Sequence, residues 1–304
     1  MAANNGKRSL AIIPCYNEQL TIARVISKSK RFVDDVLVID DGSKDNTAKI
    51  ARAAGAKVIT HNINKGKSAG IKSGFMYALQ NRYDYVITLD GDAQHNPDEI
   101  PLLLNNLKSN GNDIILGVRF GRTTEMPTWR KFGKRVLDYA TSLGAGGLVT
   151  DSQCGFRAFN KKAIENMVKK LNGKAFSVES EQLIRAHETG LNIGINKISC
   201  KYKDLDTSTQ GPTAHGFSVL TFLMKHLIIK RPLLFLGFPG LIMLIFGLIL
   251  SLQYLLVYDQ VNIFNIGYFF LLSTLLITGT IAITSGLVIN RLPTLLKKIN
   301  YKFR

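Results

Sequence analysis

Asp90 and Asp92 are the pair whose type and spacing most directly suggest metal chemistry. They stand two positions apart where the apolar run Tyr85–Asp90 ends, so both carboxylates can reach one point if the second lies just beyond a strand. Carboxylate oxygens are preferred ligands of Mg²⁺ and Mn²⁺, and a divalent cation there could neutralise a diphosphate. Such pairs are also common at solvated strand ends, so the surrounding motifs must decide the interpretation.

Three further motifs give this acidic pair a context. One apolar run ends in Pro14-Cys15-Tyr16-Asn17-Glu18, a second ends in Asp40-Asp41-Gly42-Ser43, and a Gly-rich basic segment, Asn64–Gly70, precedes Asp90. Carboxyl ends of parallel strands line the crevice in which open α/β sheets bind ligands. We therefore expect these motifs to meet at one edge of a sheet.

The elements that would position these motifs alternate between short apolar runs and helical segments. This alternation predicts an α/β fold with a mostly parallel sheet covered by helices. Helices are expected to begin at Asn17, Asp45 and Pro97, where the residues suit a cap or a first turn. The expected strands are Ser9–Pro14, Val36–Asp40, Lys57–Thr60, Tyr85–Asp90 and Asp113–Val118.

On these motifs the sequence resembles glycosyltransferase family 2, and within it the enzymes that glycosylate dolichyl or polyprenyl phosphate. The resemblance implies a GT-A (Rossmann-like) nucleotide-sugar domain, Mg²⁺ or Mn²⁺ as cofactor, and inverting transfer of a hexosyl unit from a GDP- or UDP-linked sugar. Neither the sugar nor the base follows from it. The matching segments occur in order at residues 14–18, 38–47, 64–67, 90–97, 117–119 and 151–157.

The resemblance also implies roles for single residues. Asp90 corresponds to the residue beside the donor phosphates, and Asp92 and Gln94 correspond to the metal ligands. An ordinary first-turn acid at Glu18 and a plain turn at Asp41 are the structural alternatives to a role in binding. The expected nucleotide contacts are Pro14, Tyr16, Glu18, Asp40, Asp41 and Lys67.

A basic cluster interleaved with aromatic residues follows the fifth expected strand. Such a pattern suits a phosphate headgroup whose lipid lies against apolar side chains. By similarity, Arg119 and Arg130 occupy the places of the family's lipid-phosphate arginines, and we expect them to be catalytic together with Asp90 and Asp92. Lys134 stands where some relatives have a hydroxyl residue, and it is a third candidate for the acceptor phosphate.

Two other positions have competing interpretations. Glu179 and Glu181 follow Ser177, so they could complement a helix N-terminus or lie near the donor sugar, where the family often has an acid. His95 could be a general base, although a His in a polar loop before Pro97 is more often solvated. A phosphate acceptor already carries its oxyanion, so attack does not strictly require a protein base.

The composition changes after Arg231, because residues 232–290 contain one acid, Asp259, and no Lys or Arg. Two apolar runs, about 233–258 and 263–289, are long enough to span a bilayer as a helical hairpin. The expected organisation is a catalytic domain at 1–213, an interfacial amphipathic helix at 214–231, two transmembrane helices within 232–290 and a basic tail at 291–304.

Basic residues flank this hairpin and none lies at its tip, which predicts that the catalytic domain and both termini are cytoplasmic. The polar N-terminus leads into too few apolar residues for a signal peptide. Cys15, Cys154 and Cys200 form no Cys-x-x-Cys pair, which fits a reducing compartment. Two spans per chain would suit a homo-oligomer without requiring one.

The chain carries a net charge of +17, which suits an anionic lipid surface beside two spans, and we expect no nucleic-acid partner because no nucleic-acid-binding motif is present. A processive polysaccharide synthase of the same family is the alternative enzyme. It would normally contain a Gln-x-x-Arg-Trp motif, which is absent around Trp129, the single tryptophan. A scaffold without catalysis would predict damaged acidic clusters, whereas these are intact.

Overall fold

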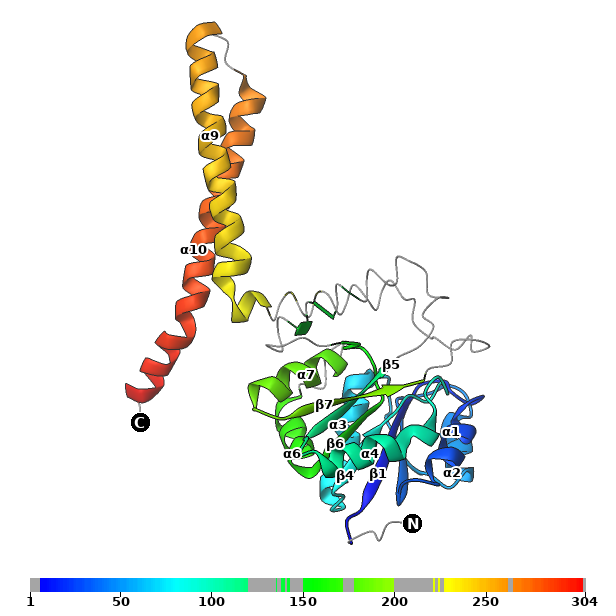
Figure 1. The fold of residues 1–304 in the computed structure, drawn as a ribbon. Helices are drawn as coiled ribbons and strands as arrows, with labels where there is room; N and C mark the ends of the chain where they lie inside the picture. The colour runs from blue at the N-terminus through cyan, green and yellow to red at the C-terminus, as the bar shows by residue number, and fades with distance from the viewer. Residues whose placement is uncertain are drawn as a thin grey trace. The chain divides into compact units, whose positions relative to one another are not determined.

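The computed structural model describes residues 6–119, 135, 138–139, 141–142, 150–171, 178–199, 221, 224, 227–261 and 265–302. The chain divides into two compact units, Met1–Phe222 and Leu223–Arg304. The first unit is an α/β domain and the second is built from long apolar helices (Figure 1).

A seven-stranded sheet forms the centre of the first unit, in the order β3-β2-β1-β4-β6-β5-β7. All of its neighbouring strands pair in parallel except at β6, which is antiparallel to both β4 and β5. The carboxyl ends of β1, β2, β4 and β5 therefore lie at one edge, together with the start of β6. The strands are β1 (Ser9–Cys15), β2 (Asp35–Asp40), β3 (Lys57–Thr60), β4 (Tyr85–Thr88), β5 (Ile114–Arg119), β6 (Arg157–Asn160) and β7 (Ile193–Ile198).

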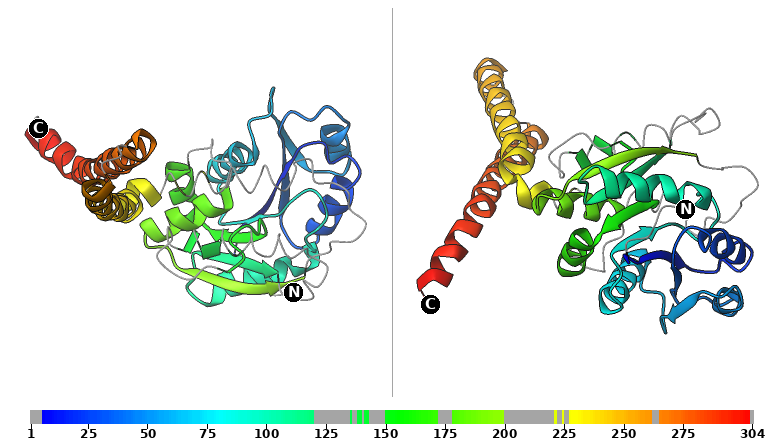
Figure 2. Two further views of the ribbon diagram at one scale, coloured as in Figure 1. Left: turned by 90° about the horizontal axis from the view of Figure 1, so that it is seen from above. Right: turned by 60° about the horizontal axis from the view of Figure 1, so that its bottom comes forward.

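Helices cover both faces of this sheet (Figure 2). Alternate strand residues point to opposite faces, so Ala11 and Ile13 enter one core whereas Leu10 and Ile12 enter the other. The first core is closed by α1, α2 and α4, and the second by α3, α6 and α7. The helices are α1 (Ile22–Ser29), α2 (Thr47–Ala53), α3 (Lys67–Gln80), α4 (Ile100–Ser109), α6 (Lys161–Lys170) and α7 (Val178–Glu188).

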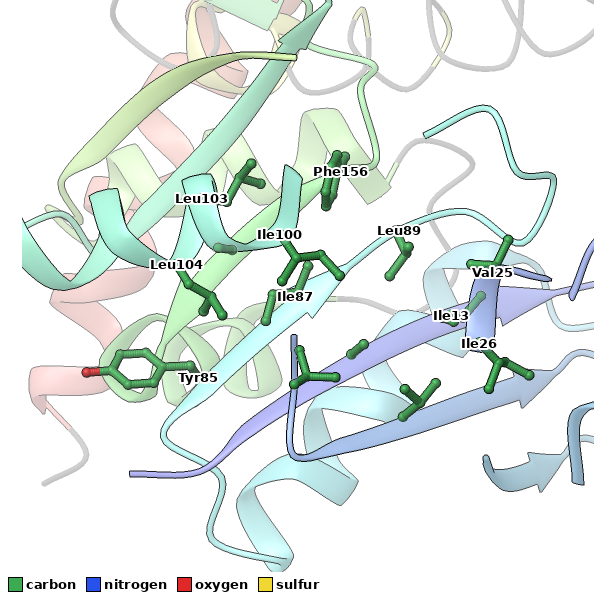
Figure 3. Packing of buried hydrophobic residues seen from close by; sticks show 14 of the residues in the cluster. Ile13, Val25, Ile26, Tyr85, Ile87, Leu89, Ile100, Leu103, Leu104 and Phe156 are labelled. Atoms are coloured by element: carbon green, nitrogen blue, oxygen red, sulfur yellow. The ribbon is translucent and has the colours of Figure 1, made fainter. Parts of the chain in front are cut away.

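The first core links the strands to the helix that follows the acidic pair. Ile87 and Leu89 pack in the same buried cluster as Ile100 and Leu103 of α4, and Phe156 closes the cluster near β6 (Figure 3). Full burial of each such side chain contributes about 1.5–3 kcal/mol to the stability of the fold. This packing fixes the carboxyl end of β4 in space. Asp90 and Asp92 thus extend from a rigid base.

One of the predicted helix starts is wrong. Asn17 adopts a φ of 57°, so no right-handed helix begins there, and α1 starts at Ile22. Instead, the Asn17 side chain accepts a hydrogen bond from the Lys44 amide at 2.9 Å, joining the loops after β1 and β2. A one-turn 3₁₀ helix, η1 (Pro97–Glu99), occupies the third predicted start and leads into α4. The second prediction, at Asp45, lies two residues before α2.

The second unit contains a π-helical turn, η3 (Leu233–Gly237), followed by α9 (Phe238–Val261) and α10 (Ile266–Lys302). Segments Leu233–Tyr258 and Ile266–Leu292 are long and apolar enough to cross a membrane, with mean hydropathies of 2.6 and 2.0. The predicted α/β domain followed by two apolar helices is confirmed. Most of the expected interfacial helix at 214–231 lies outside the described residues.

Candidate active site

A small pocket opens at the carboxyl edge of the sheet, where β1 and β4 end. The predicted residues Pro14, Lys67, Asp90 and Glu179 all line it. Gly155 and Gln182 complete its polar part, and Ile71, Thr88, Leu89 and Val178 form the rest of the wall. Residues from five separate segments of the chain therefore meet where the sequence motifs predicted a crevice.

The Lys67 ammonium joins two acids inside this pocket. Its Nζ lies 2.5 Å from Asp90 Oδ1 and 2.7 Å from Glu179 Oε1. Despite its burial, Asp90 has a pKa lowered to about 2, chiefly because of the charge on Lys67. Gly155 lies against this pair: a Cβ at that position would be 2.9 Å from Lys67 Nζ and 3.0 Å from Asp90 Oδ1. A side chain at position 155 would therefore displace the end of Lys67 from Asp90.

Asp92 and Glu18 form a second acidic group beside Asp90. Burial and the charge of Asp90 raise the pKa of Asp92 to about 6, and burial together with Asp92 raises that of Glu18 to about 7. Thr21 joins the two loops, because its hydroxyl donates to the Gly91 carbonyl at 2.7 Å and its oxygen lies 3.2 Å from Glu18 Oε2. Three acids thus concentrate negative charge at one end of the site.

This donor set fits a divalent cation. Burial, and after it the neighbouring acids, raises the pKa of Glu18 and of Asp92, and a bound divalent cation would offset the repulsion between these carboxylates. Asp92 Oδ1 accepts a hydrogen bond from the Gln94 amide at 3.0 Å, so the two predicted ligands belong to one tight turn. No group of three or more His, Cys, Asp or Glu in the described segments forms a ready-made metal cage.

Asp40 ends β2 and Asp41 follows it, and both carboxylates accept hydrogen bonds from backbone amides. Asp40 Oδ1 accepts from the Ser43 amide at 3.2 Å. The buried carboxylate of Asp41 accepts from the Lys65 amide at 3.0 Å and the Gly66 amide at 2.7 Å, and it contacts His61 Nδ1 at 2.7 Å. Asp41 therefore fixes the turn from which α3, and with it Lys67, begins.

Tyr16 lies on the loop after β1 and is half-buried. Pro14, near the end of β1, lines the pocket, and Glu18 on this loop lies beside Asp92.

Arg119 ends β5 at the same edge of the sheet as Asp90. Asp151 holds it through both carboxylate oxygens: Arg119 Nε donates to Oδ2 at 2.8 Å and Nη2 to Oδ1 at 2.5 Å. Because this fork fixes the plane of the guanidinium, Asp151 orients the predicted acceptor arginine. Arg130 and Lys134, the other two predicted acceptor residues, lie outside the described residues.

The two acids of α7 have different surroundings. Glu179 reaches Lys67 in the pocket, whereas Glu181 Oε1 lies 3.9 Å from Arg185 of the same helix. Residues two apart on a helix point in different directions, so these environments follow from the helical geometry. Glu179 is the acid that lies in the pocket.

His95 is buried rather than solvated, which corrects one interpretation of the sequence. Its ring packs against Phe156 with centroids 5.4 Å apart, and Nδ1 accepts weakly from the Asp90 amide at 3.5 Å. Burial lowers the pKa of His95 to about 4, so the ring is neutral at physiological pH. The apolar partner, Phe156, is distant in sequence, which is why local polarity was misleading.

Arg157 is a site residue whose role the motif pattern did not reveal. It is 1% exposed and opens β6, and it donates hydrogen bonds to four acceptors in the loop before it and in α7. Its position within the motif at 151–157 was the available signal. The antiparallel insertion of β6 between β4 and β5, which brings it to the site, leaves no local pattern.

Residues 10–168 match the protein family described as glycosyl transferase family 2. A UDP-N-acetylglucosamine–dolichyl-phosphate N-acetylglucosaminyltransferase of Methanococcus voltae is 32% identical over 234 residues, covering 70% of this chain and 93% of that protein. An uncharacterised protein of Methanocaldococcus jannaschii is 30% identical, with coverages of 71% and 90%. The chain therefore belongs to glycosyltransferase family 2, and it is a glycosyltransferase.

Two further comparisons bear on specificity and fold. An undecaprenyl-phosphate 4-deoxy-4-formamido-L-arabinose transferase of Pseudomonas paraeruginosa is 30% identical, and the match spans 52% of this chain and 48% of that protein. The structure of Mycobacterium tuberculosis glucosyl-3-phosphoglycerate synthase with Mn²⁺, UDP and glucosyl-3-phosphoglycerate is similar, with a TM-score of 0.57 at 21% identity, covering 73% of this chain and 80% of that chain. The predicted GT-A-like fold is confirmed.

Proposed function

We propose that this enzyme transfers a glycosyl unit from a UDP-linked sugar to a polyprenyl phosphate of the dolichyl type, with inversion and with Mg²⁺ or Mn²⁺ as cofactor. The observation that carries the proposal is the placing of Arg119, fixed by Asp151, at the same edge of the sheet as the Asp90 pocket. Relatives named for transfer to dolichyl and undecaprenyl phosphate support this acceptor, and the Methanococcus voltae relative supports a UDP-linked donor.

The donor end of the site would be organised by charge. Bound at Asp92 and Gln94, the divalent cation would neutralise the leaving nucleoside diphosphate. Asp41 holds the turn that begins α3, and this places Lys67 beside Asp90. Glu179 reaches the same lysine at 2.7 Å, and we assign it to contact the donor sugar.

The acceptor end would be organised by arginines. A phosphate monoester is already an oxyanion, so its attack on the anomeric carbon requires positioning more than proton removal. Asp151 presents the Arg119 guanidinium in a fixed plane, and Arg130 is proposed to bind the same phosphate, with Lys134 beside it. The buried, neutral His95 packs against Phe156 and does not serve as the base in this mechanism.

The two apolar helices would keep the lipid acceptor within reach of the enzyme. We propose that they span the membrane as a hairpin, with the catalytic domain and both termini on the cytoplasmic side.

The proposal is tested by incubating the purified full-length chain in detergent with Mn²⁺, polyprenyl phosphate and a panel of UDP- and GDP-sugars. We expect one UDP-sugar to give a lipid-phosphate-linked sugar, identified by mass spectrometry, whose anomeric configuration is opposite to that of the donor. Polyprenyl alcohol and 3-phosphoglycerate serve as acceptor controls. Transfer to either control with none to polyprenyl phosphate would overturn the proposed acceptor.

A further inference from the structure

Arg157 carries a charge in the interior of the catalytic domain. It is 1% exposed and lies in register with Thr88 of β4 and Leu116 of β5. Its partners are neutral: Nε donates to the Cys154 carbonyl at 2.8 Å, Nη2 to the Ser152 carbonyl at 2.7 Å, and Nη1 at 2.8 Å to both acceptors on α7. Those two acceptors are the Glu179 carbonyl and Gln182 Oε1.

A guanidinium in this position is costly for a purely structural purpose. Burying a charge loses its hydration, and an apolar side chain of similar volume often stabilises a core as well or better. The four acceptors fall on two segments, however, and the planar fork of an arginine can bind both at once. Arg157 thus joins the loop 151–155 to the first turn of α7.

Both of these segments contribute to the pocket. Gly155, in the loop, lies where even a Cβ would meet Lys67 and Asp90, and Glu179, in the first turn of α7, binds Lys67. A shift of either segment would therefore disturb the same ion pair. Arg157 donates to the backbone carbonyl of Glu179 itself, so it controls the position of that residue directly.

The loop 151–155 is also held from its other side. Asp138 accepts hydrogen bonds from the Ser152 amide at 2.8 Å, the Ser152 hydroxyl at 2.7 Å and the Asp151 amide at 3.3 Å. Donors of the loop thus face Asp138, whereas its carbonyls face Arg157. Since the same loop carries Asp151, which orients Arg119, it connects the acceptor arginine to the donor pocket.

We propose that Arg157 is a positioning residue for the transfer reaction: by fixing Glu179 and the loop 151–155 against Asp90, it holds the bound donor sugar in one orientation. Arg157 touches no substrate in this account and acts through Glu179. This inference rests on the proposed function, because the assay measures that transfer reaction. The role of Arg157 itself is argued from the hydrogen bonds of the described residues.

The test is a double-mutant cycle with Arg157→Lys and Glu179→Gln in the full-length chain. Lysine keeps the charge but donates from one nitrogen and cannot span both segments. Each single substitution should lower kcat by roughly 10- to 100-fold, the effect expected of a misplaced reacting group. The kcat of the double variant should be within about 3-fold of the kcat of the less active single variant, because the two residues act as one unit.

Binding measurements separate positioning from general damage. Calorimetry with Mn²⁺ should show an unchanged affinity for UDP and a weaker affinity for UDP-N-acetylglucosamine in Arg157→Lys. Arg52→Lys, an exposed arginine whose Nη2 donates to Thr60 at 3.3 Å, is the matched control and should match the wild type. If Arg157→Lys does not fold, Gln182→Met removes one acceptor only and should show the same pattern more weakly.

Two results would overturn the proposal. The first is a loss of kcat in the double variant that equals the product of the two single losses. The second is a lowered thermal midpoint of Arg157→Lys while its kcat and its affinity for the UDP-sugar stay at the wild-type values, as expected of a purely structural residue. If the wild type transfers nothing to polyprenyl phosphate, the proposed function fails, whereas the difference between UDP and UDP-sugar affinity still tests Arg157.

Discussion

Glu18 shows how the charge of single residues sets the behaviour of the site. Burial and Asp92 raise its pKa to about 7, from an ordinary value of 4.5. Between these values the folded protein keeps a proton that the unfolded chain has released, so stability without metal should fall as pH rises through this window. Glu18 is only partly shielded from solvent, which reduces the effect to about 1 kcal/mol, or roughly 2–4 °C in thermal midpoint.

The measurement is thermal unfolding in chelator from pH 5 to pH 8, compared between wild type and Glu18→Gln. The variant should show the shallower dependence on pH, and Mn²⁺ should flatten the wild-type curve. Equal slopes for the two proteins would show that Glu18 does not titrate in this window.

For single residues, the sequence predicted which ones lie in the site better than it predicted their side-chain contacts. Pro14, Lys67, Asp90 and Glu179 were all predicted, and they line one pocket, because each lies near the end of a strand or in the first turn of a helix at the same sheet edge. Side-chain partners depend on residues distant in sequence. The turn at Lys65–Gly66 that Asp41 holds is therefore visible only in the structure.

The helices α9 and α10 depend on small residues where they meet. A Cβ on Gly240 would lie 2.8 Å from the Gly279 carbonyl and 2.8 Å from Ala282 Cβ. Close backbone approach of this kind drives helix association in membranes. We expect Gly240→Ala to destabilise the pair by about 1–3 kcal/mol, the usual cost of overpacking.

The check is the thermal midpoint of the full-length chain in detergent, with Gly267→Ala as the control. A Cβ on Gly267 would have only Asn265 Oδ1 within 4 Å, at 3.4 Å, so this substitution should change the thermal midpoint little. Equal midpoints for the two variants would mean that the helices do not pack through Gly240.

Strands and helices were predicted well where the hydrophobic pattern is the same over the whole segment. The runs expected at 36–40, 57–60 and 85–90 fall on β2, β3 and β4, and the apolar spans are helical. The start of α1 was wrong because Asn17 has a cap-forming side chain but takes a left-handed conformation that links two loops. Strand β6 was not predicted, because antiparallel insertion is decided by pairing across the sheet.

The whole molecule is expected to have a defined orientation in the membrane. Basic residues precede the first apolar segment at Lys230 and Arg231 and follow the second at Lys297 and Lys298, whereas the connection near Asn262 has none. The asymmetry predicts that a reporter fused after Arg304 is cytoplasmic and that a tag inserted near Asn262 is accessible from the opposite side. Both labels on one side would refute the two-span hairpin.

Metal-dependent transfer from the Asp90 pocket to a lipid phosphate is the central claim, and one assay tests it most directly. Labelled sugar transfer from the UDP-sugar to polyprenyl phosphate is measured for the wild type with Mn²⁺ and with chelator, and for Asp92→Ala with Mn²⁺. Asp34→Asn, at the opposite edge of the sheet, is the control. We predict loss of transfer in chelator, a fall of at least ~100-fold in Asp92→Ala, or about 2.7 kcal/mol of transition-state stabilisation, and little change in the control. Full activity in chelator, or wild-type transfer by Asp92→Ala, would contradict this account.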